Sequence, residues 1–600
     1  MNETEKVTID RLDDWKRTHD CGSLRAEDIG REVLLMGWVN TRRDLGNLIF
    51  IDLRDREGIT QIVFDPQVEE ESHKRAHVLR NEWVVAVKGE VVPRLEGQEN
   101  PSLPTGAVEL KVRELKILNR TETPPFQVDG MVDGSESLRL KYRYLELRRN
   151  RVFENFRKRH LTAASVRNFL NDKGFIEVET PFLTKSTPEG ARDYLVPSRV
   201  NRGLFYALPQ SPQLFKQLLM IGGFDRYYQI VRCFRDEDLR ADRQPEFTQV
   251  DMEMAFADEE EVMGTVEGML QAIFREVMGM EIELPIPRME YHEAMDRYGT
   301  DRPDVRFGME LKDITDLAKD SDFRVFKSVI ESGGVVKAIN VRQGGPKFSR
   351  KVIDELTRVA ADHGAKGLAW AKVNEKGWQS SLNKFFQDQT RDRINQRLEA
   401  APGDLLLIVS DTSGIANQAL GALRLEVARR LDLIKKSNYA LLWVTRFPLV
   451  EYDDEEKRFV AVHHPFTAPL DEDLPELENH PEKVRSRAYD IVLNGSEIGG
   501  GSVRIHNTAI QEKMFRNLGI SQEEAEAKFG FLLEALKYGA PPHAGIALGF
   551  DRLVAILTGV ESIREIIAFP KTASATCLLT EAPSGVGTDQ LKELGISLIK

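Results

Sequence analysis

Two strand-like segments of this sequence, residues 227–237 and 247–253, carry charged side chains at alternating positions, and this pattern constrains the fold most. Both segments alternate and a loop of mixed charge joins them, which predicts an antiparallel hairpin. Side chains two positions apart share a face of a strand, so Arg235 and Glu237 lie together. Because charged groups are costly to bury unless paired, the hairpin borders either a cross-strand ion pair or a polar cleft.

An Arg-x-Glu pattern suits a nucleotide as well as an ion pair. A guanidinium can grip a phosphate through two hydrogen bonds, and a nearby carboxylate can accept from an adenine amino group or hold Mg²⁺. An isolated pattern of this kind is more commonly a cross-strand ion pair. Other motifs must therefore decide between the two interpretations.

The chain is long enough for several cores and has the composition of a folded protein. Its 600 residues correspond to about four domains, and 41 % hydrophobic with 30 % charged residues is ordinary globular usage. No apolar stretch approaches the roughly 18 to 20 residues of a membrane helix, and residues 1–6 lack the apolar core of a signal peptide. We therefore expect a cytoplasmic protein without membrane segments.

Several common site types are absent from the sequence. The three cysteines, Cys21, Cys233 and Cys577, are odd in number and far apart, which predicts reduced thiols rather than disulfides or a paired-cysteine metal site. No Gly-x4-Gly-Lys-Ser/Thr phosphate loop and no His-Glu-x-x-His motif occurs. These absences argue against the standard NTPase and zinc-hydrolase classes.

The charge is unevenly distributed along the chain. The net charge of −13 argues against a general basic coat for polyanions. Residues 138–159 nevertheless contain nine basic and two acidic side chains, a local excess of nine minus two, or +7. This stripe fits a solvated helix face and a nucleic-acid backbone contact equally well.

Residues 1–120 contain five short β segments, with a helix-like stretch between the third and the fourth. This order fits an OB-type barrel, which binds single-stranded nucleic acid through stacking aromatics and a polar groove; a barrel without an assigned partner is the alternative. The whole chain then has an α+β multidomain organisation. Its expected parts are the barrel (1–120), a linker (121–150), a first catalytic part (151–299), an inserted α+β domain (300–432) and a second catalytic part with a C-terminal extension (433–600).

Two further segments place charges beside glycines. In residues 487–506, Asn494-Gly495 predicts a tight turn between two strands. Glu497 and Arg504, seven positions apart, can share a face only if a bulge in the triglycine region resets the register. In residues 541–552, a glycine-rich strand leads to Asp551 and Arg552 at the start of a helix, which suits either a polyphosphate or a helix cap.

Three of these segments resemble the motifs of class II aminoacyl-tRNA synthetases. Gly174–Pro181 looks like motif 1, whose strand belongs to a dimer interface, the hairpin at Arg235 resembles motif 2, and Gly549–Arg552 resembles motif 3. The strings that are similar to the bacterial aspartyl type are Pro188–Tyr194, Gln210–Gln217, His463–Phe466 and Gly499–Arg504. The resemblance covers essentially the whole chain, including the barrel and the insertion.

The resemblance implies a two-step ligation. Aspartate and ATP form aspartyl-adenylate and pyrophosphate, and a ribose hydroxyl at the 3′ end of tRNA-Asp then takes the aspartyl group. ATP as a substrate, Mg²⁺ and a homodimer are implied as well. The attack of a carboxylate on phosphorus needs positioning and charge neutralisation, which arginines and Mg²⁺ supply without a nucleophilic side chain.

Carried over residue by residue, the resemblance also implies the site. The catalytic residues would be Arg235, Glu237, Glu497 and Arg552, with Glu497 as the Mg²⁺ ligand. The ATP site would comprise Arg235, Asp236, Glu237, Gln244, Glu497, Gly549, Phe550, Asp551 and Arg552. Aspartate would be held by Glu189, Gln213, Lys216, Arg235, Asp251, His463 and Arg504. Lys216 and Arg504 would reject asparagine, because its neutral amide would leave charged donors unpaired.

The implied anticodon contacts fall on the barrel, at Arg43, Phe50, Gln61 and Glu109. An aromatic for stacking with polar groups for base edges is typical of single-stranded RNA recognition. For Phe50 the alternative is a place in the barrel core, because it lies within an apolar run. For the tRNA partner, Leu45 is similar to the residue found in enzymes strict for tRNA-Asp, whereas the region of Gly97 is similar to that of enzymes that also charge tRNA-Asn. The sequence therefore leaves the choice of tRNA open.

Two other kinds of protein share many of these features. Lysyl- and asparaginyl-tRNA synthetases share the barrel and the motifs, but a lysine substrate would need an acidic pocket, and Lys216 and Arg504 are basic. A non-catalytic RNA-binding relative would lack part of the catalytic set, and Arg235, Glu497 and Arg552 are all present.

Overall fold

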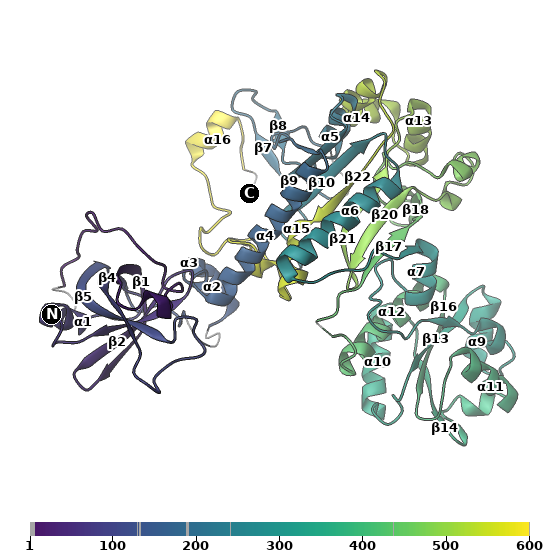
Figure 1. Ribbon diagram of the computed structural model, residues 1–600. Coiled ribbons are helices and arrows are strands. Elements are labelled where there is room, and N and C mark those ends of the chain that lie inside the picture. The colour runs from purple at the N-terminus through teal and green to yellow at the C-terminus, as the bar shows by residue number, and fades with distance from the viewer. Residues whose placement is uncertain are drawn as a thin grey trace. The chain divides into compact units, whose positions relative to one another are not determined.

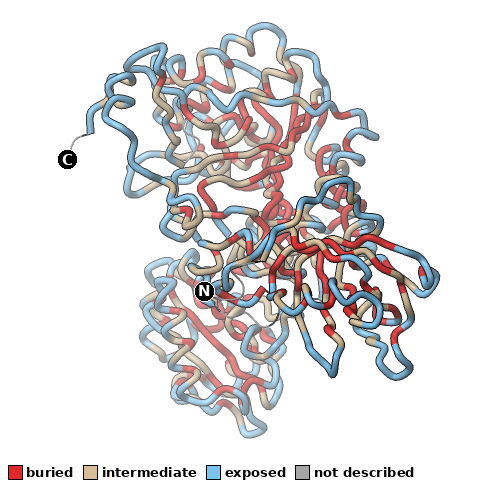
Figure 2. Tube along the Cα trace, turned by 90° about the vertical axis from the view of Figure 1, so that its left-hand side faces the viewer, coloured by how far each residue is buried: buried red, intermediate tan, exposed pale blue. Residues whose placement is uncertain are grey.

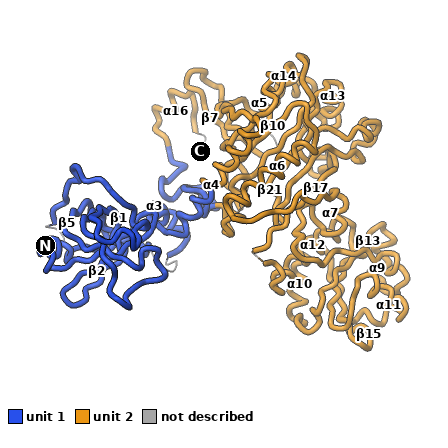
Figure 3. The backbone as a smooth tube through the Cα atoms, in the orientation of Figure 1, with its two compact units in different colours: residues 1–159, 564–585 blue, residues 160–563, 586–600 orange. Residues whose placement is uncertain are grey.

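The structure is a computed structural model that describes residues 7–128, 130, 134–187, 191–240, 242–435 and 437–598. The chain divides into two compact units (Figure 3). One comprises residues 1–159 and 564–585, and the other comprises residues 160–563 and 586–600.

The first unit contains the predicted OB-type barrel, a closed barrel with the strand order β1-β2-β3-β5-β4 (Figure 1). Its elements are β1 (Glu32–Leu45), β2 (Leu48–Arg54), β3 (Ile59–Phe64), α1 (Glu70–Ala76), β4 (Val84–Pro93) and β5 (Val108–Asn119). In β2, Ile49, Ile51 and Leu53 are buried in the barrel core, so the alternate residues Phe50 and Asp52 lie on its outer face. The core alternative for Phe50 is therefore wrong.

The basic stripe runs through α2 (Glu136–Lys141), α3 (Arg143–Glu146) and the start of α4 (Asn150–Asp172). Arg143 is buried, donates to the backbone oxygens of Ala568 and Ile567 at 3.0 Å each, and pairs with Glu146 at 2.6 Å. Arg148 pairs with the buried Glu82 at 2.9 Å. Part of the stripe is thus used for internal contacts of this unit.

The second unit is built on an eight-stranded, mostly antiparallel sheet with the order β11-β17-β20-β21-β22-β10-β9-β6. Its strands are β6 (Ile176–Glu177), β9 (Arg226–Phe234), β10 (Glu246–Ala255), β11 (Arg288–Glu290), β17 (Leu441–Thr445), β20 (Ala488–Leu493), β21 (Ser496–Val503) and β22 (His543–Gly549). The β9–β10 and β20–β21 hairpins are confirmed, with Asn494 and Gly495 at positive φ in the second turn. Figure 2 shows buried positions mainly in the inner parts of the trace and exposed positions mainly at its periphery.

Helices and two small hairpins surround this sheet. The helices are α5 (Gln213–Ile221), α6 (Glu259–Ile273), which continues in a π-helical turn (Phe274–Met278), α7 (Tyr291–Tyr298), α13 (Thr508–Asn517), α14 (Gln522–Leu536), α15 (Phe550–Thr558) and α16 (Thr588–Leu594). The hairpins are β7 (Leu195–Pro197) with β8 (Phe205–Ala207) and β18 (Val450–Asp453) with β19 (Arg458–Ala461).

The region predicted as an insertion has its own five-stranded sheet, in the order β12-β13-β16-β14-β15. Its elements are β12 (Lys312–Asp313), α8 (Thr315–Ala318), α9 (Arg324–Glu331), β13 (Val335–Val341), α10 (Arg350–Asp362), β14 (Ala369–Asn374), β15 (Gly377–Gln379), α11 (Asp388–Arg397), β16 (Leu405–Asp411) and α12 (Ser413–Arg430). Leu405 and Leu407 pack with α10 and α12, whereas Leu406 and Ile408 pack with α9 and α11. The apolar run of β16 is therefore buried on both faces, and the expected α+β class is confirmed.

Candidate active site

One cavity of about 630 Å³ collects residues from the regions that resemble motifs 2 and 3. Its walls come from the β9–β10 hairpin, from β21 and from the junction of β22 with α15, which meet because β22 pairs with both β21 and β10. The sequence-predicted residues that line it are Gln213, Lys216, Arg235, Glu237, Gln244, His463, Glu497, Arg504, Gly549, Asp551 and Arg552. The charged strands thus border a polar cleft as well as forming ion pairs.

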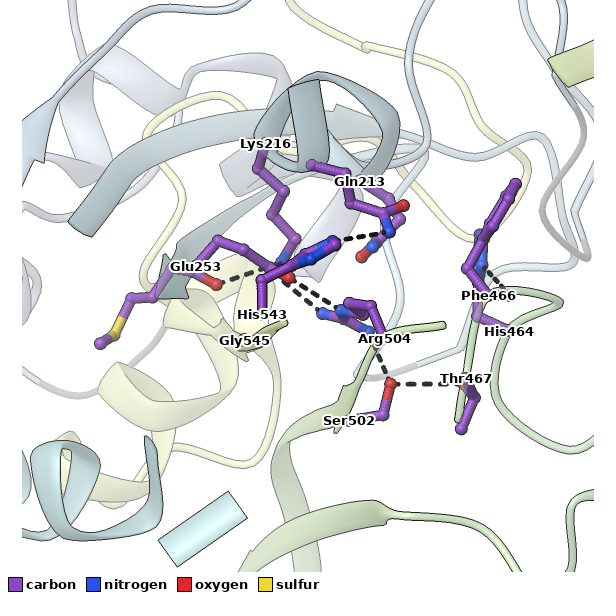
Figure 4. A network of polar contacts seen from close by, with 12 residues as sticks. Gln213, Lys216, Glu253, His464, Phe466, Thr467, Ser502, Arg504, His543 and Gly545 are labelled. Atoms are coloured by element: carbon purple, nitrogen blue, oxygen red, sulfur yellow. Dashed lines mark hydrogen bonds and ion pairs between the residues drawn. The ribbon is translucent and has the colours of Figure 1, made fainter. Parts of the chain in front are cut away.

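Lys216 and Arg504 converge on one buried glutamate (Figure 4). Lys216 Nζ lies 3.1 Å from Glu253 Oε2, and Arg504 Nε donates to Glu253 Oε1 at 2.9 Å. Lys216 also donates to Asp251 Oδ1 at 2.8 Å. All four side chains are buried, so two carboxylates already balance the two cations.

The two carboxylates that contact these cations differ in pKa. Burial raises the pKa of Asp251 to about 6, because desolvation outweighs the attraction of Lys216. Burial acts on Glu253 as well, but Arg504 and Lys216 together outweigh it and lower the pKa of Glu253 to about 2. Glu253 is therefore an anion at neutral pH and fixes both cations in place.

Some polar groups in this part of the cavity retain free hydrogen-bonding capacity. Arg504 donates from Nε and Nη2 to Glu253 and from Nη1 to Ser502 Oγ, so three of its five N–H groups are used among the described residues. Within the same described residues, Gln213 Nε2 and Asp251 Oδ2 have no hydrogen-bond partner. Because buried polar atoms are nearly always paired, these atoms are available to a small polar ligand or to water.

Two arginines occupy another part of the cavity. Arg235 lies over the Phe247 ring, 5.1 Å from its centroid, and Arg235 Nε has no hydrogen-bond partner among the described residues. Arg552 donates from Nη1 to the backbone oxygen of Glu497, and its Nη2 lies 3.3 Å from Asp242 Oδ2. Asp242 is half exposed, so an anionic ligand could replace this contact at little cost.

A cluster of ionisable groups lies beside Arg552. The charge of Asp490, with a further contribution from burial, raises the pKa of Glu497. Burial alone would lower the pKa of His463, but Asp490, whose Oδ1 lies 3.0 Å from His463 Nε2, outweighs it and raises that pKa. Among the described residues no group of three or more His, Cys, Asp or Glu side chains could hold a metal. A divalent cation at Glu497 and Asp490 would therefore need further oxygens from a ligand.

A β-bulge explains how Glu497 reaches this cavity together with Arg504. The register of β20 with β21 shifts by one residue, and Ile498 is the extra residue. The expectation that a bulge brings these two side chains to one site is confirmed, although the bulge precedes the glycines. The glycines are needed for close packing, since a Cβ at Gly500 would lie 2.6 Å from Asp490 Oδ1.

Asp551 lines the cavity, and its carboxylate accepts from the Thr248 backbone N–H of β10 at 2.7 Å, which fixes the start of α15 against that strand. Asp251 lies beneath Lys216, whereas Asp236 and the buried Phe550 are not among the lining residues. Glu189 lies outside the described residues.

The four predicted anticodon residues lie on neighbouring strands of the barrel. Arg43 Nη2 donates to Gln61 Oε1 at 3.1 Å, and Gln61 Nε2 donates to Glu109 Oε2 at 2.6 Å. Phe50 pairs with Arg43 across β1 and β2. Burial raises the pKa of Glu109, despite the hydrogen bond from Gln61. These residues form one polar patch with an aromatic side chain, the anticodon patch.

None of the described helices combines the length and the apolar character that crossing a bilayer requires.

Residues 135–573 match the family of class II tRNA synthetases (D, K and N), and residues 33–118 match an OB-fold nucleic acid binding domain. Among curated proteins, the chain is 59 % identical to the aspartate–tRNA(Asp/Asn) ligase of Desulfatibacillum aliphaticivorans over 592 residues, covering 98 % of this chain and 99 % of that protein. It is also 59 % identical to the ligase of the same name from Syntrophotalea carbinolica, with the same coverage of both chains.

Solved structures are similar in fold. The asparaginyl-tRNA synthetase of Pyrococcus horikoshii in complex with asparaginyl-adenylate superposes with a TM-score of 0.58 at 20 % identity, covering 93 % of this chain and 98 % of that one. The aspartyl-tRNA synthetase of Entamoeba histolytica gives a TM-score of 0.56 at 18 % identity, with 92 % and 91 % coverage. At these identities the similarity concerns the fold alone.

Proposed function

This chain belongs to the aspartate–tRNA ligases of class II, and we propose on this premise that it joins L-aspartate to the 3′ end of tRNA with ATP, through aspartyl-adenylate. The observation that carries the proposal is the cavity that holds both the Glu253-bound cations and the arginines Arg235 and Arg552. Such a site offers one set of donors to a carboxylate and another to phosphates.

For aspartate, we assign the side-chain carboxylate to Arg504 and Lys216. Arg504 supplies its two remaining N–H groups, and Lys216 supplies charge at short range. We assign Asp251, which contacts Lys216 but does not itself line the cavity, to the charge balance near the substrate's ammonium group, and Gln213 and His463 to the cavity wall. Because four ionised protein groups already sum to zero, the preference for aspartate over asparagine rests on the directed N–H groups of Arg504 rather than on net charge.

For ATP, we assign the α-phosphate to Arg235 and the γ-phosphate to Arg552. The Phe247 ring packs against the Arg235 guanidinium and limits its movement. Little side-chain conformational entropy is therefore lost when a phosphate binds. Glu237 and Gln244 line the nucleotide part, whereas Gly549 lets the backbone approach the ligand closely. Asp236, Phe550 and Glu189 stay predictions from the resemblance.

Mg²⁺ fits the pair Glu497 and Asp490. The repulsion between the two carboxylates, visible in the raised pKa of Glu497, would be relieved by a divalent cation. Two carboxylates with phosphate oxygens are a usual Mg²⁺ environment. When bound, Mg²⁺ supplies positive charge to the phosphates during the displacement. The chain's own residues hold the aspartate carboxylate and the phosphate in line and neutralise developing charge, without a covalent enzyme intermediate.

An exchange assay tests this proposal. Aspartate is expected to drive incorporation of labelled pyrophosphate into ATP, whereas asparagine and lysine give at least 10³-fold lower kcat/KM, because their side chains leave the Arg504 donors unpaired. Exchange driven by lysine or asparagine at a comparable rate would reassign the chain to one of those synthetases. The complete absence of exchange with all three amino acids would favour a non-catalytic role.

For the RNA partner, we propose both tRNA-Asp and tRNA-Asn, as the names of the two bacterial relatives suggest. Leu45, which is exposed, and Gly97 give conflicting cues, and charging of each purified tRNA decides between them. Failure to aspartylate tRNA-Asn would restrict the enzyme to tRNA-Asp.

The anticodon patch gives a separate prediction. Phe50→Ala is expected to raise the KM for tRNA by about 10-fold or more, because a base loses its stacking partner, worth about 1–3 kcal/mol. Aspartate-dependent exchange should remain unchanged, since the cavity lies in the other compact unit. A matched loss of both activities would show that Phe50 acts through stability instead.

We also propose that two copies assemble around the motif 1 region. Ile176, Phe182 and Leu183 lie in and just after the edge strand β6, and their exposed fractions are 50 %, 43 % and 54 %. An exposed strand edge flanked by apolar side chains favours a partner. Sedimentation of a monomer at micromolar concentration would argue against this assembly. We also propose a cytoplasmic location, which stays a prediction.

A further inference from the structure

The loop between α7 and β12 contributes two charged residues to the cavity. Asp301 and Arg302 both line it, although the sequence placed them at the start of the inserted domain. Glu497 lines the same cavity, and the Asp301 charge contributes to the raised pKa of Glu497. The insertion is therefore not separate from the site, and its first loop borders the part that we assign to the phosphates.

The inserted domain itself holds this loop through α12. Arg424 of α12 is buried and donates from Nη2 to the backbone oxygens of Asp304 and Phe307, at 2.8 Å each, and of Gly308 at 3.0 Å. Its guanidinium carbon also lies 4.0 Å from the centroid of the Phe307 ring. Burial lowers the pKa of Arg424 to about 10, so the group stays charged at neutral pH.

Asp304 holds the same loop through a contact within the loop and a contact with the catalytic sheet. Arg306 holds the buried Asp304 through two hydrogen bonds, from Nε at 2.9 Å and from Nη2 at 2.7 Å. Gly495, in the turn between β20 and β21, packs so closely on Asp304 that a Cβ there would lie 2.9 Å from the Asp304 Cβ. The loop is thus fixed between α12 and the strand that carries Glu497.

The cations of this cavity differ in whether an acidic side chain contacts them. Lys216, Arg504 and Arg552 each contact an acidic side chain. Across the described parts of the chain, Arg302 has no ion pair and is exposed. Arg302 is thus an exposed arginine that lines a polar cavity and lies on an anchored loop. These are the properties of an anion-binding group.

We propose that Arg302 binds the terminal phosphates of ATP, and of the pyrophosphate product, and that Arg424 positions it. This inference rests on the proposed adenylate-forming function and gives the inserted domain a role in it. A triphosphate carries more charge than Arg235 and Arg552 can neutralise, and a third guanidinium in the same cavity reduces the remainder. Asp301 keeps the loop from repelling Mg²⁺ at Glu497.

The test compares Arg302→Ala with the control Arg324→Ala. Arg324 is an exposed arginine of α9 in the same domain and does not line the cavity. Calorimetric titration with ATP and Mg²⁺ is expected to give an at least tenfold higher Kd for Arg302→Ala, because charge-assisted hydrogen bonds are lost, and no change for the control. An unchanged Kd for ATP would overturn the proposal, and so would an increase confined to the KM for tRNA.

The positioning role of Arg424 is tested with Arg424→Lys, which keeps the charge but cannot bridge three carbonyl groups at once. We expect a higher Kd for ATP with an unchanged KM for aspartate, and no further increase when Arg302→Ala is added. Additive effects of the two changes would overturn the positioning role. Because the titration needs no turnover, a wild-type protein that binds ATP but shows no exchange would count against the proposed function alone.

Discussion

Arg504→Lys is expected to raise the KM for aspartate in pyrophosphate exchange by about 10²- to 10³-fold, with little change in the KM for ATP. Lysine keeps a positive charge beside Glu253 but lacks the planar guanidinium of Arg504. That group donates two hydrogen bonds to Glu253 and has two further N–H groups for the substrate carboxylate. Losing such a buried contact costs about 3–4 kcal/mol, which corresponds to this range. Exchange kinetics at saturating ATP, with aspartate varied, measure the effect.

Lysine is a better choice than leucine at this position. Arg504→Leu would leave Glu253, whose pKa lies at about 2, buried with Lys216 as its nearest cation. Removing one partner of a buried ion pair costs about 3–5 kcal/mol of stability, so lost activity would be confounded with unfolding. Glu253 stabilises the fold in its ionised form, and this contribution is lost only as the pH falls from about 4.5 toward 2.

The control for this prediction is Arg487→Lys. Arg487 is a partly buried arginine that pairs with Glu259 and does not line the cavity. Both variants should unfold near the wild-type temperature, whereas only Arg504→Lys should lose aspartate affinity. An unchanged KM for aspartate in a folded Arg504→Lys protein would remove Arg504 from the aspartate site.

Local patterns predicted the elements that carry the site. The five barrel strands and the β9–β10 hairpin follow from apolar alternation, and the Asn494-Gly495 turn follows from the need for positive φ. The bulge at Ile498 could be proposed because Glu497 and Arg504 are separated by an odd number of residues. Its position beside the glycines, however, depends on packing against β20 and could not be read from spacing.

Two acidic residues of the site were not among the sequence-predicted ones. Glu253 shares a strand face with Asp251, so the alternation carried a signal, but only the buried contacts with Lys216 and Arg504 show that Glu253 fixes both cations. Asp490 is an acidic residue in an otherwise apolar strand, which is itself costly and therefore suggestive. Neither partner could be named from the sequence, because the contacts join residues more than 25 positions apart.

The first loop of the insertion illustrates a different limit. Asp301 and Arg302 lie between a helix and a change of sequence texture, where a domain boundary is the natural interpretation. Their place at the cavity depends on Arg424, more than 100 residues later, and on Gly495 in another hairpin. No local periodicity reports such contacts. The residues missed by sequence analysis are thus those that tertiary packing, rather than strand alternation, brings to the site.

Glu497→Gln is expected to lower kcat for aspartate-dependent exchange by about 10²- to 10³-fold. Glutamine keeps the shape of the side chain but removes the charge that, with Asp490, suits Mg²⁺ beside the phosphates. The loss of one preorganised electrostatic group of this kind costs about 3–4 kcal/mol in the transition state. Single-turnover adenylate formation measures it, and Glu451→Gln, an exposed glutamate of β18, is the matched control.

The pH dependence distinguishes a metal-binding role of Glu497 from a structural one. Because Asp490 raises the pKa of Glu497, Glu497 becomes protonated at a higher pH than an ordinary carboxyl group, and exchange should fall as the pH drops through this raised pKa. Mg²⁺ binds the deprotonated form, so raising its concentration should move the acid midpoint to lower pH. In Glu497→Gln this shift should vanish while the thermal unfolding temperature stays near that of the wild type. A midpoint that moves equally in both proteins would assign Mg²⁺ to other groups and leave Glu497 without the proposed role.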